Sequence, residues 1–197
     1  DIHTQTASEV FDIPKEEVTS LMRGRAKAVN FGIVYGISDY GLSRDLDISR
    51  KEAKEYIDNY LKNYHMVNKY MHDIIEKEKK DGYEETLLNR RRYVPELQSR
   101  NFNVRSFGER IAMNTPIQGT AADIIKIAMV GVHKELTKRK LKSKLILQVH
   151  DELIIETFKG EEEEVKEIMK DIMENSIKLS IPLKVEINTG ENWYETK

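Results

Sequence analysis

The chain has 197 residues, of which 39% are hydrophobic and 34% are charged, and its formal net charge is −2. It is long enough to bury one or two cores, and its nearly balanced charge does not by itself indicate a nucleic-acid-binding protein. The absence of cysteine excludes a disulfide framework and a thiolate metal site. No apolar run is long enough to span a bilayer, so we expect no membrane partner.

The first part of the chain predicts several helices. Apolar residues at helical spacing predict a helix over 15–36, and two glycines predict a turn over 36–41. Ser49 and Glu52 form a capping-box pattern, which predicts a long helix that runs to about residue 80.

The middle of the chain predicts an irregular or hairpin-like segment between helices. Residues 82–95 hold the irregular segment, which contains three consecutive arginines. A helix over 104–114 is expected to stop before Pro116, because proline lacks the amide hydrogen of a helix interior. A second helix is then expected over 120–138.

The pattern changes after residue 143. Apolar runs at 144–149 and 153–157 flank the polar residues 150–152, which predicts a β-hairpin. Residues 161–179 predict an amphipathic helix, and residues 182–188 predict a third strand.

The predicted fold class is α+β. Residues 1–143 form a mostly helical block in this prediction, and residues 144–197 form a small antiparallel sheet with a helix packed against it. Such a helix and sheet each need a partner that covers their apolar side.

One helix carries a stripe of cations and aromatic rings. Arg23, Lys27, Phe31 and Tyr35 follow at intervals of four residues and therefore lie along one face. Cations suit the phosphates of a nucleoside triphosphate, and rings suit its base and sugar. From the spacing alone, a half-buried helix with a basic tip is the favoured interpretation.

The predicted hairpin carries two adjacent acids at its apex, Asp151 and Glu152. Their hard oxygen ligands suit Mg²⁺, which retains waters and substrate phosphates as its other ligands. The alternative is an ordinary polar turn, in which acids are frequent.

A locally basic region precedes the hairpin. Phosphate contact is one interpretation, and solvated arginines that pair with Glu96 and Glu109 are the other. The arginines of this region are Arg90, Arg91, Arg92, Arg100, Arg105 and Arg110.

Four segments together resemble the family A DNA polymerases, in particular their bacterial members. Residues 22–36 resemble motif B, whose core is Lys, three residues, Phe-Gly, two residues and Tyr-Gly, and residues 148–152 resemble motif C. Residues 1–4 and 116–123 match in order and spacing. The similarity covers essentially the whole chain and implies a helical fingers region over 1–143 and a part of the palm over 144–197.

The resemblance implies a nucleotide site on the fingers helix. Arg23, Lys27 and His3 contact the triphosphate, and Lys27 also counts as catalytic because it neutralises charge on the leaving pyrophosphate. Phe31 packs on the sugar, which implies discrimination against dideoxynucleotides. Tyr35 lies beside the template base.

The resemblance also implies template-directed transfer of deoxynucleotides to a primer 3′-hydroxyl by a two-metal mechanism. Asp151 is the catalytic Mg²⁺ ligand and Glu152 supports it. The partners are primer-template DNA and deoxynucleoside triphosphates. The residues implied in DNA binding are Arg90, Arg110, Gln118 and His150.

Two departures from the family pattern stand out. Gly24 occupies a position where the family often carries a second arginine. The family's motif A, with the other metal-binding aspartate, is absent, since the one Asp-Tyr pair is Asp39-Tyr40 and glycine follows it. The chain also begins without methionine, so we expect a fragment of a longer cytoplasmic, bacterial enzyme.

Two further expectations follow from the missing motif, and two alternatives stay open. The isolated chain is expected to be inactive, and the exposed edge of its sheet is expected to favour self-association. A module that binds nucleotide or DNA without chemistry is the main alternative. A helical protein with accidental motif matches is the other.

Overall fold

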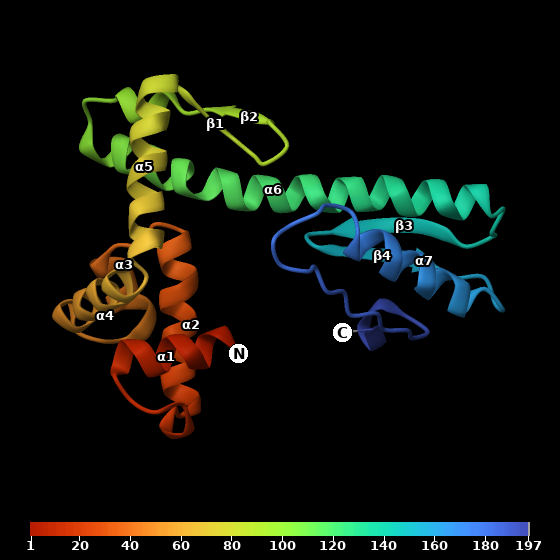
Figure 1. Ribbon diagram of the computed structural model, residues 1–197, viewed down its shortest axis with the longest axis horizontal. Coiled ribbons are helices and arrows are strands. Elements are labelled where there is room, and N and C mark those ends of the chain that lie inside the picture. The colour runs from red at the N-terminus through yellow and green to blue at the C-terminus, as the bar shows by residue number, and fades with distance from the viewer. Residues whose placement is uncertain (197) are drawn as a thin grey trace. The chain divides into compact units, whose positions relative to one another are not determined.

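The computed structural model describes residues 1–196, and their contacts fall into two compact units. The first unit is Asp1–Ile117 and the second begins at Gln118 (Figure 1). The predicted division after residue 143, into a fingers region and a part of the palm, stays a prediction.

The first unit is built mainly from helices, and its larger core lies among the first of them. In chain order these are α1 (Ile2–Phe11), the 3-10 helix η1 (Lys15–Glu17), α2 (Ser20–Val34), α3 (Asp39–Leu46), α4 (Arg50–Asn63) and α5 (His65–Asp81). Their buried core side chains are Val10, Val29, Ile33, Leu42, Ala53 and Tyr60.

Side-chain caps explain where four of these helices begin. A side-chain oxygen of the residue before the helix accepts a hydrogen bond from a free backbone N–H of the first turn. The capping residues are Asp1 for α1, Thr19 for α2, Ser38 for α3 and Ser49 for α4.

A short hairpin follows α5 and precedes α6. Strands β1 (Tyr83–Glu85) and β2 (Arg91–Tyr93) pair antiparallel, which confirms the hairpin-like segment predicted over 82–95. The 3-10 helix η2 (Pro95–Gln98) then leads to α6 (Phe102–Lys138).

The second unit holds a hairpin and a helix that share a core with the later part of α6. Strands β3 (Lys144–Val149) and β4 (Glu152–Glu156) pair antiparallel, as predicted, and α7 (Glu162–Glu174) follows. The 3-10 helix η3 (Trp193–Thr196) ends the described chain. The buried core residues are Ile125, Ala128, Val132, Leu136, Leu153, Val165, Ile168 and Met173.

Several predicted boundaries were wrong for identifiable reasons. The helix predicted over 15–36 begins only at Ser20, because the side chain of Thr19 caps it there. The long helix predicted over 49–80 is divided at Tyr64, whose φ of −104° and ψ of 56° are not helical. Helix α7 ends at Glu174 rather than residue 179.

Three further differences concern whole elements. No strand is present at 182–188, so the third strand was wrong, and the sheet of the second unit has two strands in the described chain. Helices α1 and α3 were not predicted. The break at Pro116 was also wrong, since α6 continues through it and gives up one backbone hydrogen bond.

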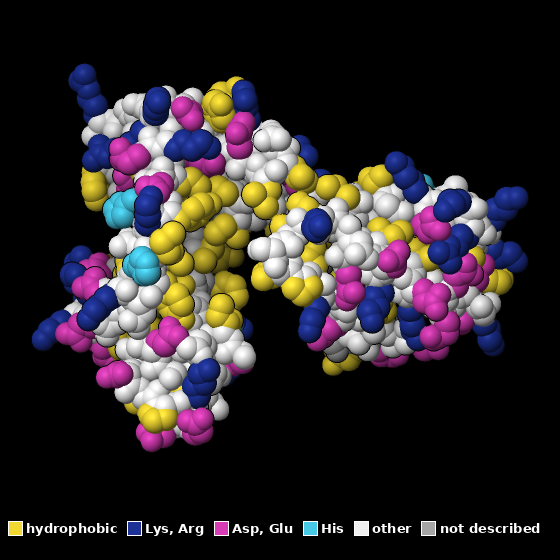
Figure 2. Space-filling view, viewed as in Figure 1, with side chains coloured by type: hydrophobic (Ala, Val, Ile, Leu, Met, Phe, Trp, Pro, Cys, Tyr) yellow, Lys and Arg dark blue, Asp and Glu magenta, His cyan; other side chains and the backbone are white. Residues whose placement is uncertain are grey.

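The predicted α+β class is confirmed by the helices and the two small antiparallel sheets. No helix within residues 1–196 has the length and apolar character needed to cross a membrane. In Figure 2, positive and negative side chains are interspersed over both units, and hydrophobic side chains gather over the region of α2 and α5.

Candidate functional site

Helix α2 presents the predicted stripe to solvent. Arg23, Lys27 and Phe31 are exposed along one face, and Tyr35 is the C-cap residue at the end of the helix. The Lys27 ammonium lies 6.0 Å from the centre of the Phe31 ring. The spacing of four residues therefore does place these groups on one surface.

The two rings of the stripe lie on the exposed side of α2. Phe31 is 48% exposed and Tyr35 is 47% exposed, whereas Ala26 and Val29 are completely buried on the other side of α2. The aromatic residues of the stripe are therefore not core residues. Rings exposed next to cations can receive a base or a sugar.

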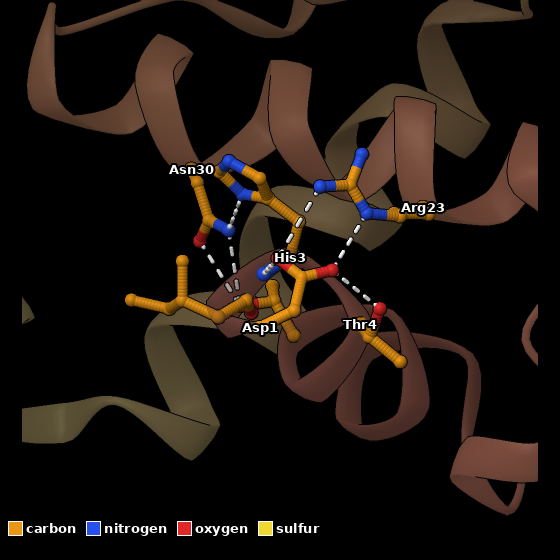
Figure 3. A network of polar contacts seen from close by, with 7 residues as sticks. Asp1, His3, Thr4, Arg23 and Asn30 are labelled. Atoms are coloured by element: carbon orange, nitrogen blue, oxygen red, sulfur yellow. Dashed lines mark hydrogen bonds and ion pairs between the residues drawn. The ribbon is translucent and has the colours of Figure 1, made fainter. Parts of the chain in front are cut away.

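Asp1 holds the Arg23 side chain against the beginning of α1 (Figure 3). Arg23 Nε lies 2.6 Å from Asp1 Oδ2, and Arg23 Nη2 lies 3.3 Å from Asp1 Oδ1. The same carboxylate accepts a hydrogen bond from the Thr4 hydroxyl at 2.6 Å. This two-point contact fixes the plane of the guanidinium and leaves its remaining N–H groups for another acceptor.

His3 lies beside the stripe and is held from α2. Asn30 Nδ2 lies 3.0 Å from His3 Nδ1, and the His3 and Phe31 ring centres are 5.8 Å apart. Burial lowers the pKa of His3, and the charges of Arg23 and Lys27 lower it further. Both effects favour the neutral imidazole.

Gly36 brings the end of α2 into close contact with α6. Its φ is 66°, and a Cβ added there would lie 2.8 Å from Arg110 Cγ and 2.5 Å from Met113 Cε. Only glycine fits this position without strain. As a result Arg110 lies next to the turn that follows Tyr35.

The arginine group is spread over the β1–β2 hairpin and the first turns of α6. Arg91 forms an ion pair with Glu85 at 2.7 Å and stacks on Tyr83, with 4.4 Å from its guanidinium carbon to the ring centre. Arg110 lies 5.8 Å from the centre of the exposed Phe107 ring. Such exposed pairs of arginine and aromatic rings leave both open interpretations, phosphate contact and solvation, in place.

The β3–β4 hairpin places the two acids at a tight turn. Val149 pairs with Glu152, so His150 and Asp151 form a two-residue loop, and His150 has a positive φ of 51°. Gln148 Nε2 donates to the His150 carbonyl oxygen at 2.7 Å. Trp193 Nε1 donates to Glu152 Oε2 at 3.4 Å.

The carboxylates of the turn supply only a part of a cation site. Asp151 and Glu152 are both exposed and adjacent, which fits Mg²⁺, an ion that is often held by one or two carboxylates. Across residues 1–196, no three His, Asp or Glu side chains are close enough together to enclose a metal ion.

The predicted residues therefore fall into two groups. His3, Arg23, Lys27 and Phe31 lie together in the first unit, as do Tyr35 and Arg110 at the end of α2. Arg90 also belongs to the first unit, where it lies on the loop of the β1–β2 hairpin. The second unit holds the other predicted residues, Gln118, His150, Asp151 and Glu152.

Sequence reasoning missed the residues that hold this site. Asp1, followed three residues later by Thr4, is a residue type that often begins a helix, so its capping role could be read from the sequence. Its contact with Arg23 could not, because the two residues meet only in the fold. Asn30 gives no local signal, because its partners His3 and Thr6 lie far away in the chain.

Comparison with known proteins identifies relatives of the whole chain. Residues 1–195 match the family described as DNA polymerase family A. The chain is 57% identical over 197 residues to DNA polymerase I of Bacillus subtilis (strain 168) and 54% identical to that of Bacillus caldotenax. It is fully covered in both alignments but spans only 22% of the length of each relative.

A solved structure shows the same fold. The POL domain of Pol1 from M. smegmatis, in complex with DNA primer-template and dNTP, matches with a TM-score of 0.94 at 43% identity. The match covers 100% of this chain and 35% of that one.

Proposed function

Because the chain belongs to DNA polymerase family A, we propose that it is part of an enzyme that synthesises DNA on a template. The resemblance predicted from four sequence motifs is thereby confirmed. The observation that carries the proposal is the exposed stripe of α2, with two cations and an exposed ring beside His3. The reaction is transfer of a deoxynucleotide to a primer 3′-hydroxyl, in replication or in repair.

In this proposal α2 is the nucleotide-binding helix. Arg23, Lys27 and His3 contact the triphosphate, and Lys27 neutralises the charge that develops on the leaving pyrophosphate. Phe31 packs on the sugar and Tyr35 lies beside the template base. The Arg23–Asp1 pair supports these roles, since a guanidinium that is already oriented loses less side-chain entropy on binding.

The proposed DNA contacts are Arg90, Arg110, Gln118 and His150. The related M. smegmatis domain is bound to DNA primer-template and dNTP, which supports DNA and nucleotides as partners of this chain. The position of Arg110 at the turn after Tyr35 supports a contact close to the template base.

Asp151 would hold Mg²⁺, with Glu152 beside it, because both carboxylates are exposed at one turn. When bound, a pair of such ions stabilises the charge of phosphoryl transfer and lowers the pKa of the attacking hydroxyl. The motif A aspartate of the family is not in the chain, so we expect the chain to be inactive by itself.

Primer extension tests the proposal. The chain alone, and a longer version that adds the upstream motif A and thumb of the family, receive Mg²⁺ and four deoxynucleoside triphosphates. We expect extension by the longer version only, and Asp151→Ala should abolish it. Extension by the short chain, lost in the same variant, would refute the claim of inactivity.

A module that binds nucleotide without chemistry is the second candidate. It is favoured by the fact that His3, Arg23 and Lys27 all lie within the first unit. Triphosphate binding without extension by either version would select this candidate.

A further inference from the structure

Asn30 joins α2 to α1 directly beside the cations of the site. Its Nδ2 lies 3.0 Å from His3 Nδ1 and 3.1 Å from Thr6 Oγ1. Thr6 is completely buried, and its hydroxyl also lies 2.9 Å from the Ile2 carbonyl oxygen. An amide nitrogen carries two hydrogens and can donate to both neighbours at once.

The contact with Asn30 favours one tautomer of His3. An amide NH₂ group only donates, so His3 Nδ1 must accept, and the proton of the neutral ring then lies on Nε2. A second proton, on Nδ1, would face a donor. Burial, Arg23, Lys27 and the amino group of Asp1 all lower the pKa of His3 and thus act in the same direction.

We propose that Asn30 is a positioning residue, which holds His3 as the neutral tautomer whose Nε2–H donates to a phosphate oxygen of a bound nucleoside triphosphate. This assignment rests on the nucleotide-binding role proposed above for His3. In Figure 3, Asn30 contacts His3 and Asp1 contacts Arg23. The far ends of the imidazole and the guanidinium point away from these contacts.

A neutral donor has a physical advantage at this position. An imidazolium would be repelled by Arg23 and Lys27 before nucleotide binds, whereas an uncharged N–H adds a hydrogen bond without that repulsion. The phosphate contact of His3 then does not depend on the protonation of the ring near pH 7. Without Asn30 the ring could rotate or take the other tautomer, whose Nε2 lone pair repels a phosphate oxygen.

NMR of the chain labelled with ¹⁵N-histidine tests the tautomer without any nucleotide. His3→Gln identifies the His3 signals by their loss. At pH 7 we expect a proton on Nε2 and an unprotonated Nδ1, and Asn30→Asp should move the proton to Nδ1 and raise the pKa of His3. A wild-type His3 that is protonated on Nδ1 at pH 7 overturns the proposal.

A double-mutant cycle tests the coupling to nucleotide. Titration with dTTP and Mg²⁺ should show that Asn30→Ala weakens binding by about 5-fold, the loss of one well-placed hydrogen bond. In a His3→Ala background the same change should have no further effect. His3→Gln should retain most of the affinity, because its amide can place a donor near the position of Nε2, and His3→Asn should not.

Asn63→Ala is the matched control. Asn63 Nδ2 donates to the Glu9 carbonyl oxygen at 3.0 Å, so it also ties another helix to α1, but away from the stripe. We expect it to leave dTTP affinity unchanged. An equal effect of Asn30→Ala with and without His3 would show a purely structural role and overturn the proposal.

The two experiments separate this proposal from the function on which it depends. If the wild-type chain and the longer version both fail to bind dTTP, the nucleotide-binding role of His3 is wrong. The positioning role of Asn30 then also fails, even if His3 has the expected tautomer. If dTTP binds but the proton lies on Nδ1, the function stands and the role of Asn30 fails.

Discussion

Arg23 and Lys27 carry the same charge on one face of α2 but have different surroundings. The Arg23 guanidinium is engaged on two sides by Asp1, whereas the Lys27 ammonium is exposed and lies 6.0 Å from the Phe31 ring centre. Asp1 partly neutralises Arg23 and fixes its direction. Lys27 is therefore the less restrained of the two cations.

Lys27→Ala should weaken the binding of a deoxynucleoside triphosphate by about 10-fold or more, because a charge-assisted contact to phosphate is lost. Isothermal titration in the intact protein measures this. Lys62→Ala, which removes another exposed lysine from α4, should leave the affinity unchanged. Unchanged affinity in Lys27→Ala would mean that the motif B resemblance does not extend to function.

Glu78 on α5 is the most unusual single residue outside the site. It is completely buried, and neither carboxylate oxygen has a hydrogen-bond partner in the described chain. Burial, followed by the charge of Glu84, raises the pKa of Glu78 to about 7, although Arg92 and Lys77 act in the opposite direction and Glu96 adds to the rise. The folded protein therefore binds a proton that the unfolded chain has already lost at pH 6.

Stability should consequently depend on pH. The contribution of Glu78 is fully present below its unfolded pKa of about 4.5 and is lost as the pH rises through about 7. Urea unfolding at pH 5 and pH 8 should differ by up to about 3 kcal/mol, with the lower stability at pH 8.

The variant Glu78→Gln checks the origin of that difference. It keeps an uncharged group of the same size, so the difference attributed to Glu78 should disappear. Glu55→Gln, at an exposed position on α4, should retain it. Equal stability of the wild type at the two pH values would contradict the buried position of the neutral carboxyl group.

At the scale of elements, α2 has one buried face and one exposed face, and its two ends are built differently. Thr19 caps the beginning, with 3.3 Å from its Oγ1 to the Met22 nitrogen. Gly36 ends the helix region with a positive φ and a close approach to α6. Gly24, in contrast, lies inside the helix with open space where a Cβ would be.

The two glycines should therefore respond in opposite ways to the same change. Gly24→Ala should stabilise the protein by up to about 1 kcal/mol, because alanine loses less backbone entropy in a helix. Gly36→Ala should destabilise it by more than about 1 kcal/mol, because of the positive φ and the contacts at 2.5 and 2.8 Å. Thermal unfolding of both variants measures this, and a loss of stability in Gly24→Ala would contradict the open surroundings of that residue.

At the scale of the whole molecule, the small sheet of the second unit exposes apolar side chains. It has two strands in the described chain, and Ile146 and Leu147 of β3 are 52% and 47% exposed. A two-stranded sheet with apolar side chains in water readily pairs with another strand. The relatives, of which the chain spans 22%, have further sequence that could supply such a strand.

The chain by itself should therefore associate through β3. Light scattering should show a dimer or larger species, and Ile146→Lys should shift the population toward the monomer because a charge disfavours strand pairing. A wild-type chain that remains a monodisperse monomer at high concentration would contradict this expectation.

Much of the local structure and most of the candidate site could be predicted from the sequence. The β3–β4 hairpin follows from two apolar runs around a polar turn, and the face shared by Arg23, Lys27 and Phe31 follows from helical geometry alone. Family resemblance rested on residues that are near one another within each motif. These features depend on interactions between residues close in the chain, which is why the sequence determined them.

Only the tertiary structure decided the rest. Whether Phe31 is buried, whether α6 continues through Pro116, and why residues 182–188 form no strand depend on what packs against each segment. The Asn30–His3 contact likewise joins residues 27 positions apart. Burial and long-range hydrogen bonds arise from segments that meet only in the fold, and no local pattern encodes those meetings.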